Sequence, residues 1–303
     1  MELIQLLSFH EIVKTESFSK ASRNVFRSQS ALSHQIKNLE KELGVKLFDR
    51  IGKTIKVKEE GRILFDIIDK FVYDLEDLRK ILIDVKKSKV GNLTIASSSS
   101  IMTYVLPDIV RRFINQFPGV NLKLIACSFF SEIQSLVLEG KIDFGIGIAS
   151  DQMLPRRINY VSWKLFDTIL IAPKGHSLSY RKAVRLGDIA PYPHIIYRKG
   201  SRLSSMIEEV YARNKIDYKI IMEVDVAENI KSYVEMGFGV GILSSVTLTT
   251  KDKNRFAILN VSNLFGKVEI GIYYRNGQYI STTMKQFMKL FAPELLNRII
   301  SPT

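Results

Sequence analysis

The chain has 303 residues and a net charge of +13, from 44 lysines and arginines against 31 aspartates and glutamates. This length allows two or three domains of about 100–200 residues each, and the positive charge favours a polyanionic partner. The single cysteine, Cys127, excludes an internal disulfide and a cysteine cluster for zinc. The sequence has no basic signal-peptide segment and no apolar run of about 18 residues. We therefore expect a cytoplasmic protein with no membrane contact and with neither a metal nor another cofactor.

The first part of the chain has the periodicity of three helices. Apolar spacing predicts helices over residues 2–15 and 28–43, with a short helix between them that ends near Phe26. Ser28 and Gly44 suit the N-cap and the C-cap of the third helix. Two short helices joined by a tight turn predict a helix-turn-helix.

The third predicted helix has two distinct faces. At about 100° per residue, one face, which we expect to be buried, carries Leu32, Ile36, Leu39 and Leu43. The opposite face carries Ser30, Ser33, His34, Lys37 and Lys41. Short hydroxyls followed by cations suit base edges and phosphates in a DNA major groove. The alternative is an ordinary solvent-exposed helix face.

Basic residues lie on both sides of this helix. Residues 55–58 alternate apolar and basic side chains after Gly52, which predicts a small basic β-wing. The cations that we expect to contact DNA phosphates are Lys20, Arg23, Arg27 and Lys53. The alternative for each run is solvated surface charge. Residues 52–54 end like a nucleotide-binding loop, but Leu47 stands where that motif needs glycine.

A long helix with a heptad pattern is predicted over residues 59–85. Its apolar positions are Leu64, Ile68, Phe71, Leu75, Leu78 and Leu82. We expect this seam to pair with the same helix of a second copy, so that two DNA-binding modules read an inverted repeat. The alternative is a helix that packs on its own domain.

The N-terminal residues resemble the signature of the LysR-type transcriptional regulators of bacteria. The matching positions are Phe18, Ala21, Val25, Ser28 to Ser33, Gln35, Ile36, Leu39, Glu40, Leu43, Gly44, Leu47, Phe48 and Arg50. Two departures are Ser22, where alanine is common, and the segment 57–61. The resemblance implies that Gln29, Ser30, Ser33 and Arg50 contact DNA. It also implies a homotetramer on an interrupted palindrome, with RNA polymerase as a further candidate partner.

The resemblance extends over the whole chain and implies an α/β fold with three parts. A winged helix-turn-helix domain, rich in α-helix, occupies residues 1–58, and a linker helix occupies 59–89. An effector domain resembling the two-lobed periplasmic binding proteins occupies 90–303. By the same resemblance, lobe I comprises 90–163 and 266–303, and lobe II comprises 164–265.

Strands and helices alternate after residue 90, which independently predicts a parallel sheet covered by helices. Ligands of such sheets bind beyond the carboxyl ends of the strands. Ser97 to Ser100 lie at a predicted strand end directly before a helix, where hydroxyls and backbone N–H groups can bind an anion. The alternative is that one serine caps the helix and the others are loop residues.

A finer resemblance is to the CysB-like regulators of sulfur assimilation, through residues 104–107, 142–144 and 225–241. This chain has Ile101 where that subgroup has a glutamine, and Ile148 where it has a threonine. Near residues 198–202 it has cations where the subgroup has threonines. We expect a small anionic effector, with a sulfur metabolite as one candidate. The predicted effector contacts are Ser97, Ser98, Ser100, Ile101, Ile148, Arg198 and Arg202. The alternative for the two arginines is surface charge.

An enzyme fused to a DNA-binding head is the rival function. The sequence has no metal-protease, hydrolase or dithiol motif. The segment 237–241 is rich in glycine, but it follows a predicted helix and enters a strand, which reverses the order of a dinucleotide-binding loop. The sequence therefore favours a regulator without catalytic residues, and a bifunctional DNA-binding enzyme is the alternative.

Overall fold

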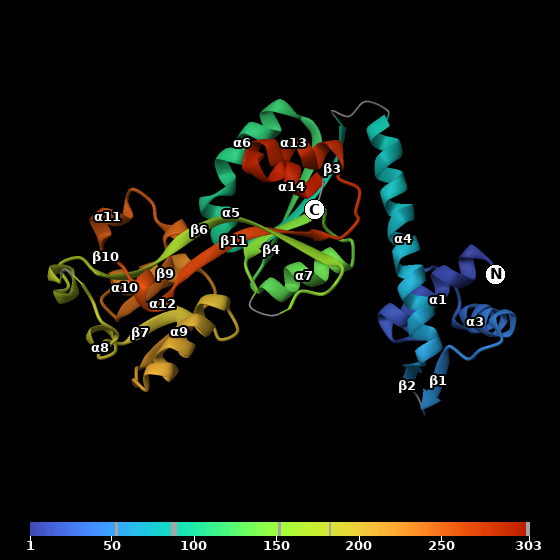
Figure 1. The fold of residues 1–303 in the computed structure, drawn as a ribbon, viewed down its shortest axis with the longest axis horizontal. Coiled ribbons are helices and arrows are strands. Elements are labelled where there is room, and N and C mark those ends of the chain that lie inside the picture. The colour runs from blue at the N-terminus through green and yellow to red at the C-terminus, as the bar shows by residue number, and fades with distance from the viewer. Residues whose placement is uncertain (52–53, 86–89, 151–152, 182, 301–303) are drawn as a thin grey trace. The chain divides into compact units, whose positions relative to one another are not determined.

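The computed structural model describes residues 1–51, 54–85, 90–150, 153–181 and 183–300. The chain divides into two compact units, Met1–Leu82 and Ile83–Thr303 (Figure 1). Within the described ranges, none of the helices combines the length and apolar character needed to cross a membrane.

The N-terminal unit is a helix-turn-helix followed by a hairpin and a long helix. Its elements are α1 (Leu3–Thr15), α2 (Phe18–Asn24), α3 (Gln29–Leu43), β1 (Phe48–Ile51), β2 (Thr54–Val57) and α4 (Glu59–Val85). Ser28 caps α3 by accepting a hydrogen bond from the Ala31 N–H, and Gly44 ends it in the left-handed conformation. The three predicted helices are therefore confirmed.

The core of this unit lies under the predicted apolar face of α3. Leu32, Ile36 and Leu39 are buried and pack with Phe9 of α1. Leu43, predicted on the same buried face, is instead 37% exposed in the last turn of the helix. The hairpin pairs β1 with β2, and Arg50 lies opposite Ile55. Gly52 and Lys53 lie outside the described residues.

The C-terminal unit is an α/β domain whose strands form one continuous sheet in the order β4-β3-β5-β11-β6-β9-β7-β8, with β10 paired to β6. The strands are β3 (Val90–Ser98), β4 (Gly119–Cys127), β5 (Phe144–Ile148), β6 (Ile158–Pro173), β7 (His194–Tyr197), β8 (Ile220–Val224), β9 (Val240–Ser244), β10 (Phe256–Asn260) and β11 (Lys267–Arg275). The α-helices are α5 (Ser99–Tyr104), α6 (Leu106–Gln116), α7 (Phe130–Leu138), α8 (Leu186–Ile189), α9 (Arg202–Asn214), α10 (Ala227–Glu235), α11 (Asp252–Arg255), α12 (Ser262–Phe265), α13 (Thr282–Phe291) and α14 (Leu296–Ile300). Short 3-10 turns are η1 (Ser177–Tyr180), η2 (Ser245–Thr247) and η3 (Pro293–Leu295).

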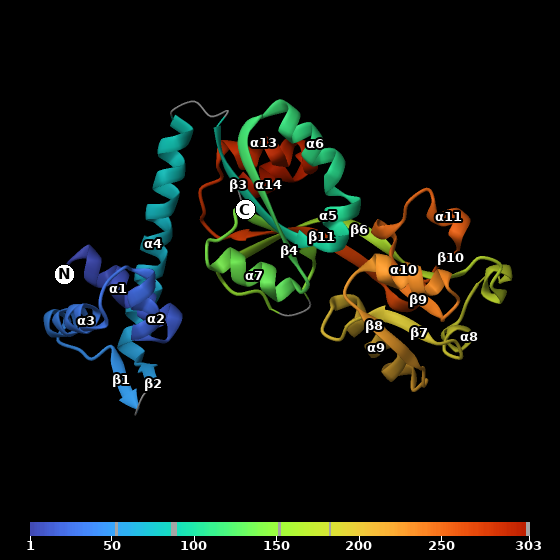
Figure 2. The same ribbon diagram turned by 180° about the vertical axis from the view of Figure 1, so that it is seen from behind.

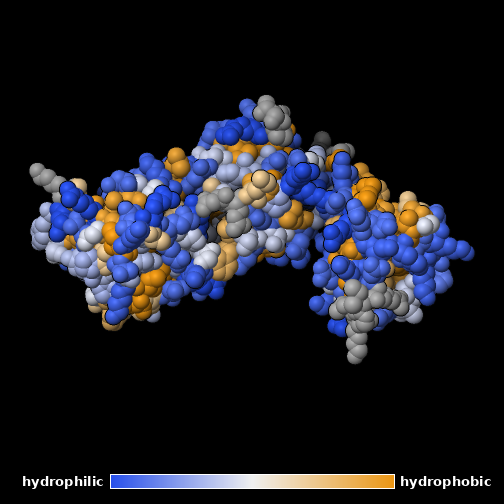
Figure 3. All heavy atoms as spheres, turned by 60° about the horizontal axis from the view of Figure 1, so that its bottom comes forward, coloured by the Kyte–Doolittle hydropathy of each residue, from blue (hydrophilic) through white to orange (hydrophobic). Residues whose placement is uncertain are grey.

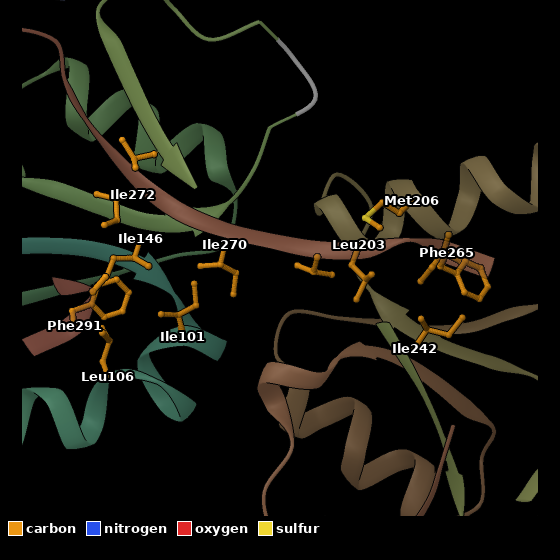
Figure 4. Close-up of a cluster of buried hydrophobic side chains, with 14 of the residues drawn as sticks. Ile101, Leu106, Ile146, Leu203, Met206, Ile242, Phe265, Ile270, Ile272 and Phe291 are labelled. Atoms are coloured by element: carbon orange, nitrogen blue, oxygen red, sulfur yellow. The ribbon is translucent and has the colours of Figure 1, made fainter. Parts of the chain in front are cut away.

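The sheet has two halves, which we call lobe I and lobe II. Lobe I contains β3, β4, β5 and β11, and lobe II contains β7, β8, β9 and β10. Helices α6 and α13 cover one face of lobe I and α7 covers the other, as both views show (Figures 1 and 2). Figure 4 shows Ile270, on β11, between the buried side chains of lobe I and those of lobe II.

One strand joins the lobes. The first part of β6 pairs with β11 through Asp167, and its last part pairs with β9 from Thr168 onward. The sequence predicted only the apolar run 168–172 as a strand, because the first part of β6 mixes polar and apolar residues. The prediction of a parallel sheet holds for β3 with β4 and β5, but β11 and β6 are antiparallel to their neighbours. The sheet is therefore mixed.

Candidate DNA-reading face and effector cavity

The face of α3 opposite the core is open to solvent. Gln29, Ser30, His34 and Lys37 are exposed, and Ser33 is half-buried. The His34 ring lies 3.3 Å from the Asn38 side-chain nitrogen, one turn along the helix. Ser30 hydrogen-bonds with the capping Ser28, and Gln29 accepts from Ser19 of α2. The predicted reading residues of α3 therefore share one face that begins at the helix N-terminus.

Exposed cations lie on α2 and in the turn that precedes α3. Lys20 and Arg23 are exposed on α2, and Arg27 is exposed in the turn. The same turn holds Phe26, which is 93% exposed and has a φ of 53°. Arg50 lies in β1, but its side chain, like the whole of Lys53, is outside the described part of the chain.

The predicted seam of α4 splits into two groups. Leu64 and Ile68 pack against the core of their own unit, beside the stacked rings of His10 and Phe65. This corrects the sequence prediction for these two residues. The structure leaves Phe71, Leu78 and Leu82 exposed, and Leu75 is half-buried.

A second apolar pair lies beside the half-buried Leu64 and the buried Ile68. Ile63 and Ile67 are 59% and 63% exposed, next to Leu64 and Ile68 in sequence. Leu64 and Ile68 pack inward because α1 covers this side of α4. On the same helix pair, Nε2 of the buried His10 lies 2.7 Å from a carboxylate oxygen of Asp69. Figure 3 shows hydrophobic residues as separate patches on a largely hydrophilic surface.

The C-terminal unit contains a cavity of about 100 Å³ between its lobes. Lobe I contributes the ends of β3 and β4 with the starts of α5 and α7, together with parts of β5 and β11. Lobe II contributes the ends of β7, β8 and β9 with the start of α9. The cavity therefore lies where the parallel strands of both lobes end, which is where ligands bind in such sheets.

The predicted serine turn has three different roles. Ser97 is fully buried and donates to the Ile146 carbonyl oxygen at 2.8 Å, and it is not part of the cavity lining. Ser98 caps α5 by accepting from the Ile101 N–H, and its hydroxyl lines the cavity. Ser100 also lines the cavity and hydrogen-bonds with Tyr197 of lobe II. Burial raises the pKa of Tyr197 to about 12, although the bond with Ser100 acts in the opposite direction.

Both predicted arginines line the cavity. The Arg198 Nε lies 2.9 Å from an Asp225 carboxylate oxygen, and its guanidinium lies 4.4 Å from the centre of the Phe129 ring. Arg198 therefore connects lobe II to lobe I. Arg202 is half-buried at the start of α9, directly after the capping Ser201.

The apolar lining includes Ile101, Ile148 and Ile270, and also Leu203. Ile101 and Ile270 are each 1% exposed, and Figure 4 shows Ile270 between Ile101 on one side and Leu203 on the other. The sequence predicted Ile101 and Ile148 at this site but missed Phe129, Asp225 and Ile270.

A buried ion pair lies beside the cavity and was also missed. Lys231 of α10 is 1% exposed and donates to Asp252 at 2.8 Å and to the Thr247 carbonyl at 2.6 Å. Its ammonium also lies 3.0 Å from the hydroxyl of Tyr104, at the end of α5. Burial alone would raise the pKa of Asp252, but hydrogen bonds from Lys231 and Thr249 lower it below its ordinary value. This cluster holds the helix after the serine turn to lobe II.

Cys127 lines the cavity. Its own burial and the negative charge of the nearby Glu132 both raise the pKa of its thiol, so the thiol stays protonated at neutral pH.

Within the described ranges, no group of three or more histidine, cysteine or acidic side chains could hold a metal ion.

Two family comparisons match this architecture. Residues 3–62 match the family described as "Bacterial regulatory helix-turn-helix protein, lysR family", and residues 86–295 match the "LysR substrate binding domain". The chain belongs to the LysR family of bacterial regulators. It is a LysR-type transcriptional regulator with an N-terminal DNA-binding head and a C-terminal effector-binding domain.

Individual relatives span almost the whole chain. The HTH-type transcriptional regulator SsuR of Burkholderia cenocepacia is 28% identical over 297 residues, which cover 97% of this chain and 96% of the relative. The HTH-type transcriptional regulator CysB of the same organism is 28% identical, with 99% and 96% covered. The solved cofactor-binding domain of the Cbl transcriptional regulator aligns with a TM-score of 0.63 and 26% identity, covering 71% of this chain and 95% of that domain. The resemblance to the CysB-like subgroup is thereby confirmed.

Proposed function

We propose that α3 reads DNA in the major groove through Gln29, Ser30, Ser33, His34 and Lys37. The observation that carries the proposal is the exposure of Gln29, Ser30, His34 and Lys37 on one face at the start of α3. Hydroxyl and amide groups near the helix N-terminus suit base edges. Lys20, Arg23, Arg27 and Lys53 contact phosphates, which supply affinity without sequence preference. Arg50 is the further DNA contact that the family resemblance implies.

Two copies pair through α4. The exposed residues Ile63, Ile67, Phe71, Leu78 and Leu82 support this pairing, because they leave a stripe of apolar surface in water. The paired heads read the half-sites of an interrupted palindrome, and two such pairs form the tetramer that the family resemblance implies. As domain limits we propose the head at 1–58, the linker at 59–89 and the two-lobed effector domain at 90–303.

The effector is a small anion bound in the cavity, and a sulfur metabolite is the candidate that the CysB-like resemblance supplies. Ser98, Ser100, Ile101, Ile148, Arg198 and Arg202 line the site. Because both lobes contribute to the lining, a bound ligand changes their relative orientation, and this change reaches the paired heads. The protein acts on DNA in the cytoplasm, without catalysis of its own, and RNA polymerase is its further partner.

The test is to sequence the genomic fragments that the purified full chain retains, with and without an extract of cell metabolites. Enrichment of an interrupted palindrome, and a change in its retention with the extract, is the expected result. Ser33→Ala should blur the enriched sequence, whereas Lys70→Ala, which removes an exposed cation from α4, should leave it unchanged. Recovery of random fragments under both conditions would refute the DNA-reading assignment.

A further inference from the structure

Phe26 is a large apolar side chain at a position where it adds little to the folded head. It lies in the turn between α2 and α3, and 93% of the residue is exposed. Contact between a phenyl ring and water is unfavourable. Single exposed apolar residues are nevertheless common on protein surfaces, so the exposure of Phe26 does not by itself indicate a contact.

The backbone of Phe26 is strained as well. The Phe26 N–H bonds to the Arg23 carbonyl at 3.3 Å, and the Arg27 N–H bonds to the Ser22 carbonyl at 2.9 Å. These two bonds close α2 as a Schellman motif, in which Phe26 occupies the left-handed position with a φ of 53°. Glycine is the usual residue there, because a Cβ atom costs free energy at positive φ. The exposed ring gains little packing that could offset this strain.

The other non-glycine residues in this conformation are of a different kind. Among the described residues, they are Glu16 and Lys215, which end α1 and α9. Both are exposed and charged, so water solvates their side chains. Closing a helix therefore does not require a phenyl ring. An apolar residue at a position that is both strained and exposed indicates a contact with another molecule.

The surroundings of Phe26 favour DNA as that molecule. Arg23 and Arg27 are exposed before and after it in the chain, and Ser28 caps α3 two residues later. Three steps of about 3.8 Å keep the Phe26 Cα within about 11 Å of the Gln29 Cα, where the reading face begins. Beside this face, DNA offers hydrocarbon in two forms, the thymine methyl group and the carbon atoms of deoxyribose.

We propose that Phe26 is a further DNA contact, whose ring packs on DNA hydrocarbon next to the base pairs that α3 reads. Arg23 and Arg27 bind neighbouring phosphates, and the ring excludes water between them. The contact buries the phenyl surface that the free head leaves in water. This inference rests on the proposed function, because it adds a residue to the same DNA-binding surface.

Titration of the full chain with the duplex enriched in the fragment selection tests the inference. Phe26→Gly should weaken binding about tenfold, because it removes a buried phenyl contact. Phe26→Leu keeps hydrocarbon at this position and should lose less than about threefold. Equal affinity of Phe26→Gly and the natural chain would overturn the inference and leave a protein as the partner of this surface.

Val45→Ala is the control for loss of exposed hydrocarbon. Val45 is 38% exposed and lies just beyond the opposite end of α3. Its replacement should leave the affinity for the enriched duplex unchanged. A loss equal to that of Phe26→Gly would overturn the inference, because it would show that any exposed apolar group of the head contributes to the same extent.

The stability of the head separates a DNA contact from a structural role. Phe26→Gly relieves the strain at positive φ, so amide hydrogen exchange in α2 and α3 of the full chain should become slower. A variant whose head is more stable but which binds DNA more weakly has lost a contact with DNA. Faster exchange together with weaker binding would mean that Phe26 stabilises the head, and this would overturn the inference.

Replacing the thymines of the enriched duplex by uracil, one at a time, identifies the hydrocarbon, because each replacement removes one methyl group. If the ring packs on a methyl group, the natural chain should lose about fourfold in affinity at one position, and Phe26→Gly should not respond there. If the ring packs on deoxyribose, Phe26→Gly should weaken enriched and random duplexes by the same factor, whichever thymine is replaced.

The variant Ser33→Ala distinguishes this inference from the proposed function. Lost discrimination in Ser33→Ala with unchanged affinity in Phe26→Gly would refute the contact of Phe26 and keep the reading face. Unchanged discrimination in Ser33→Ala with weaker binding by Phe26→Gly would keep the contact of Phe26 and refute the reading face.

Discussion

The reading face of α3 takes its side chains from one helix of 15 residues, whereas the effector cavity takes its lining from separate segments between Ser98 and Ile270. On α3, each side chain projects from a backbone that local hydrogen bonds already fix. In the cavity, Arg198 depends on Phe129 of the other lobe, and Ser100 depends on Tyr197. Substitutions on α3 that lie more than about 7–10 Å apart should therefore add independently, whereas substitutions in contact across the cavity should be coupled.

The largest expected effect is the loss of the buried ion pair beside the cavity. Asp252→Ala removes the buried carboxylate partner of the Lys231 ammonium and leaves only the exposed Glu228 carboxylate at 3.2 Å, so we expect the C-terminal unit to lose about 3–5 kcal/mol of stability. Denaturant unfolding monitored at Trp163, which lies in this unit, measures the loss. The double variant Lys231→Met with Asp252→Leu should lose less than Asp252→Ala alone, and an equal or larger loss would contradict the role of the pair.

The same pair predicts how stability depends on pH. The folded-state pKa of Asp252 is lowered, below an unfolded value near 3.9. Its contribution is therefore complete above about pH 4 and is lost as the pH falls through the folded-state pKa. Unfolding measured from about pH 7 to about pH 3 should show a smaller acid-dependent loss in Asp252→Asn than in the natural chain.

Ser33→Ala should act on sequence discrimination. If Ser33 makes one good base contact, its loss lowers the discrimination between the enriched site and a mismatched site by about 1–3 kcal/mol. Competition binding with the two duplexes measures this difference. Ser22→Ala is the control, because the Ser22 hydroxyl already donates to the Ser19 carbonyl within α2; a similar change in discrimination there would contradict the assignment of the reading face.

Ser97 and Ser98 are adjacent but should respond differently to replacement. Ser97→Ala leaves the buried Ile146 carbonyl without its side-chain donor, so we expect a loss of about 1–3 kcal/mol in stability and little change in anion affinity. Ser98→Ala removes the cap of α5, which costs about 1 kcal/mol, and should weaken anion binding clearly. Thermal unfolding measures the stability of both variants, and calorimetric titration measures their anion affinity. Weaker anion binding in Ser97→Ala would mean that Ser97 is an effector contact after all.

The smallest expected effect is a change in salt dependence. Lys53→Ala should weaken binding to specific and random duplexes about equally, and it should lower the slope of log affinity against log salt by about 1. Titrations at several salt concentrations give the slope. An unchanged slope, or a loss confined to the specific duplex, would mean that Lys53 does not contact a phosphate.

The head was predictable from sequence because its signals are local. Ser28 and Gly44 mark the ends of α3, and the residues between them have a spacing that allows one buried face. The heptad pattern of α4 was also visible, but Leu64 and Ile68 were assigned to the wrong partner. An apolar residue at helical spacing shows that a face is covered and gives no information on whether the cover is the same chain or a second copy.

The cavity was predictable only at the serine turn and at residues that the family resemblance aligned with it. Phe129 gave no signal, and Asp225 was matched only as the first residue of the segment 225–241. Their contacts with Arg198 arise from the fold and are not visible in the sequence. Lys231 did give a signal, since it lies four residues after Ala227 and three before Val234, both buried on α10. A lysine on such a face requires a buried partner, although the sequence does not show that the partner is Asp252.

The position of β11 in the sheet has a consequence for synthesis of the chain. β11 pairs with β5, and Ile148 lies opposite Ile270, which the ribosome adds roughly 120 residues later. Because synthesis adds about 5–20 residues per second, β11 follows β5 by about 6 to 24 s. Strands β6 to β10 are completed during that interval, so lobe II can fold first. The open edge of β5 is meanwhile a surface on which a nascent chain can aggregate or recruit a chaperone.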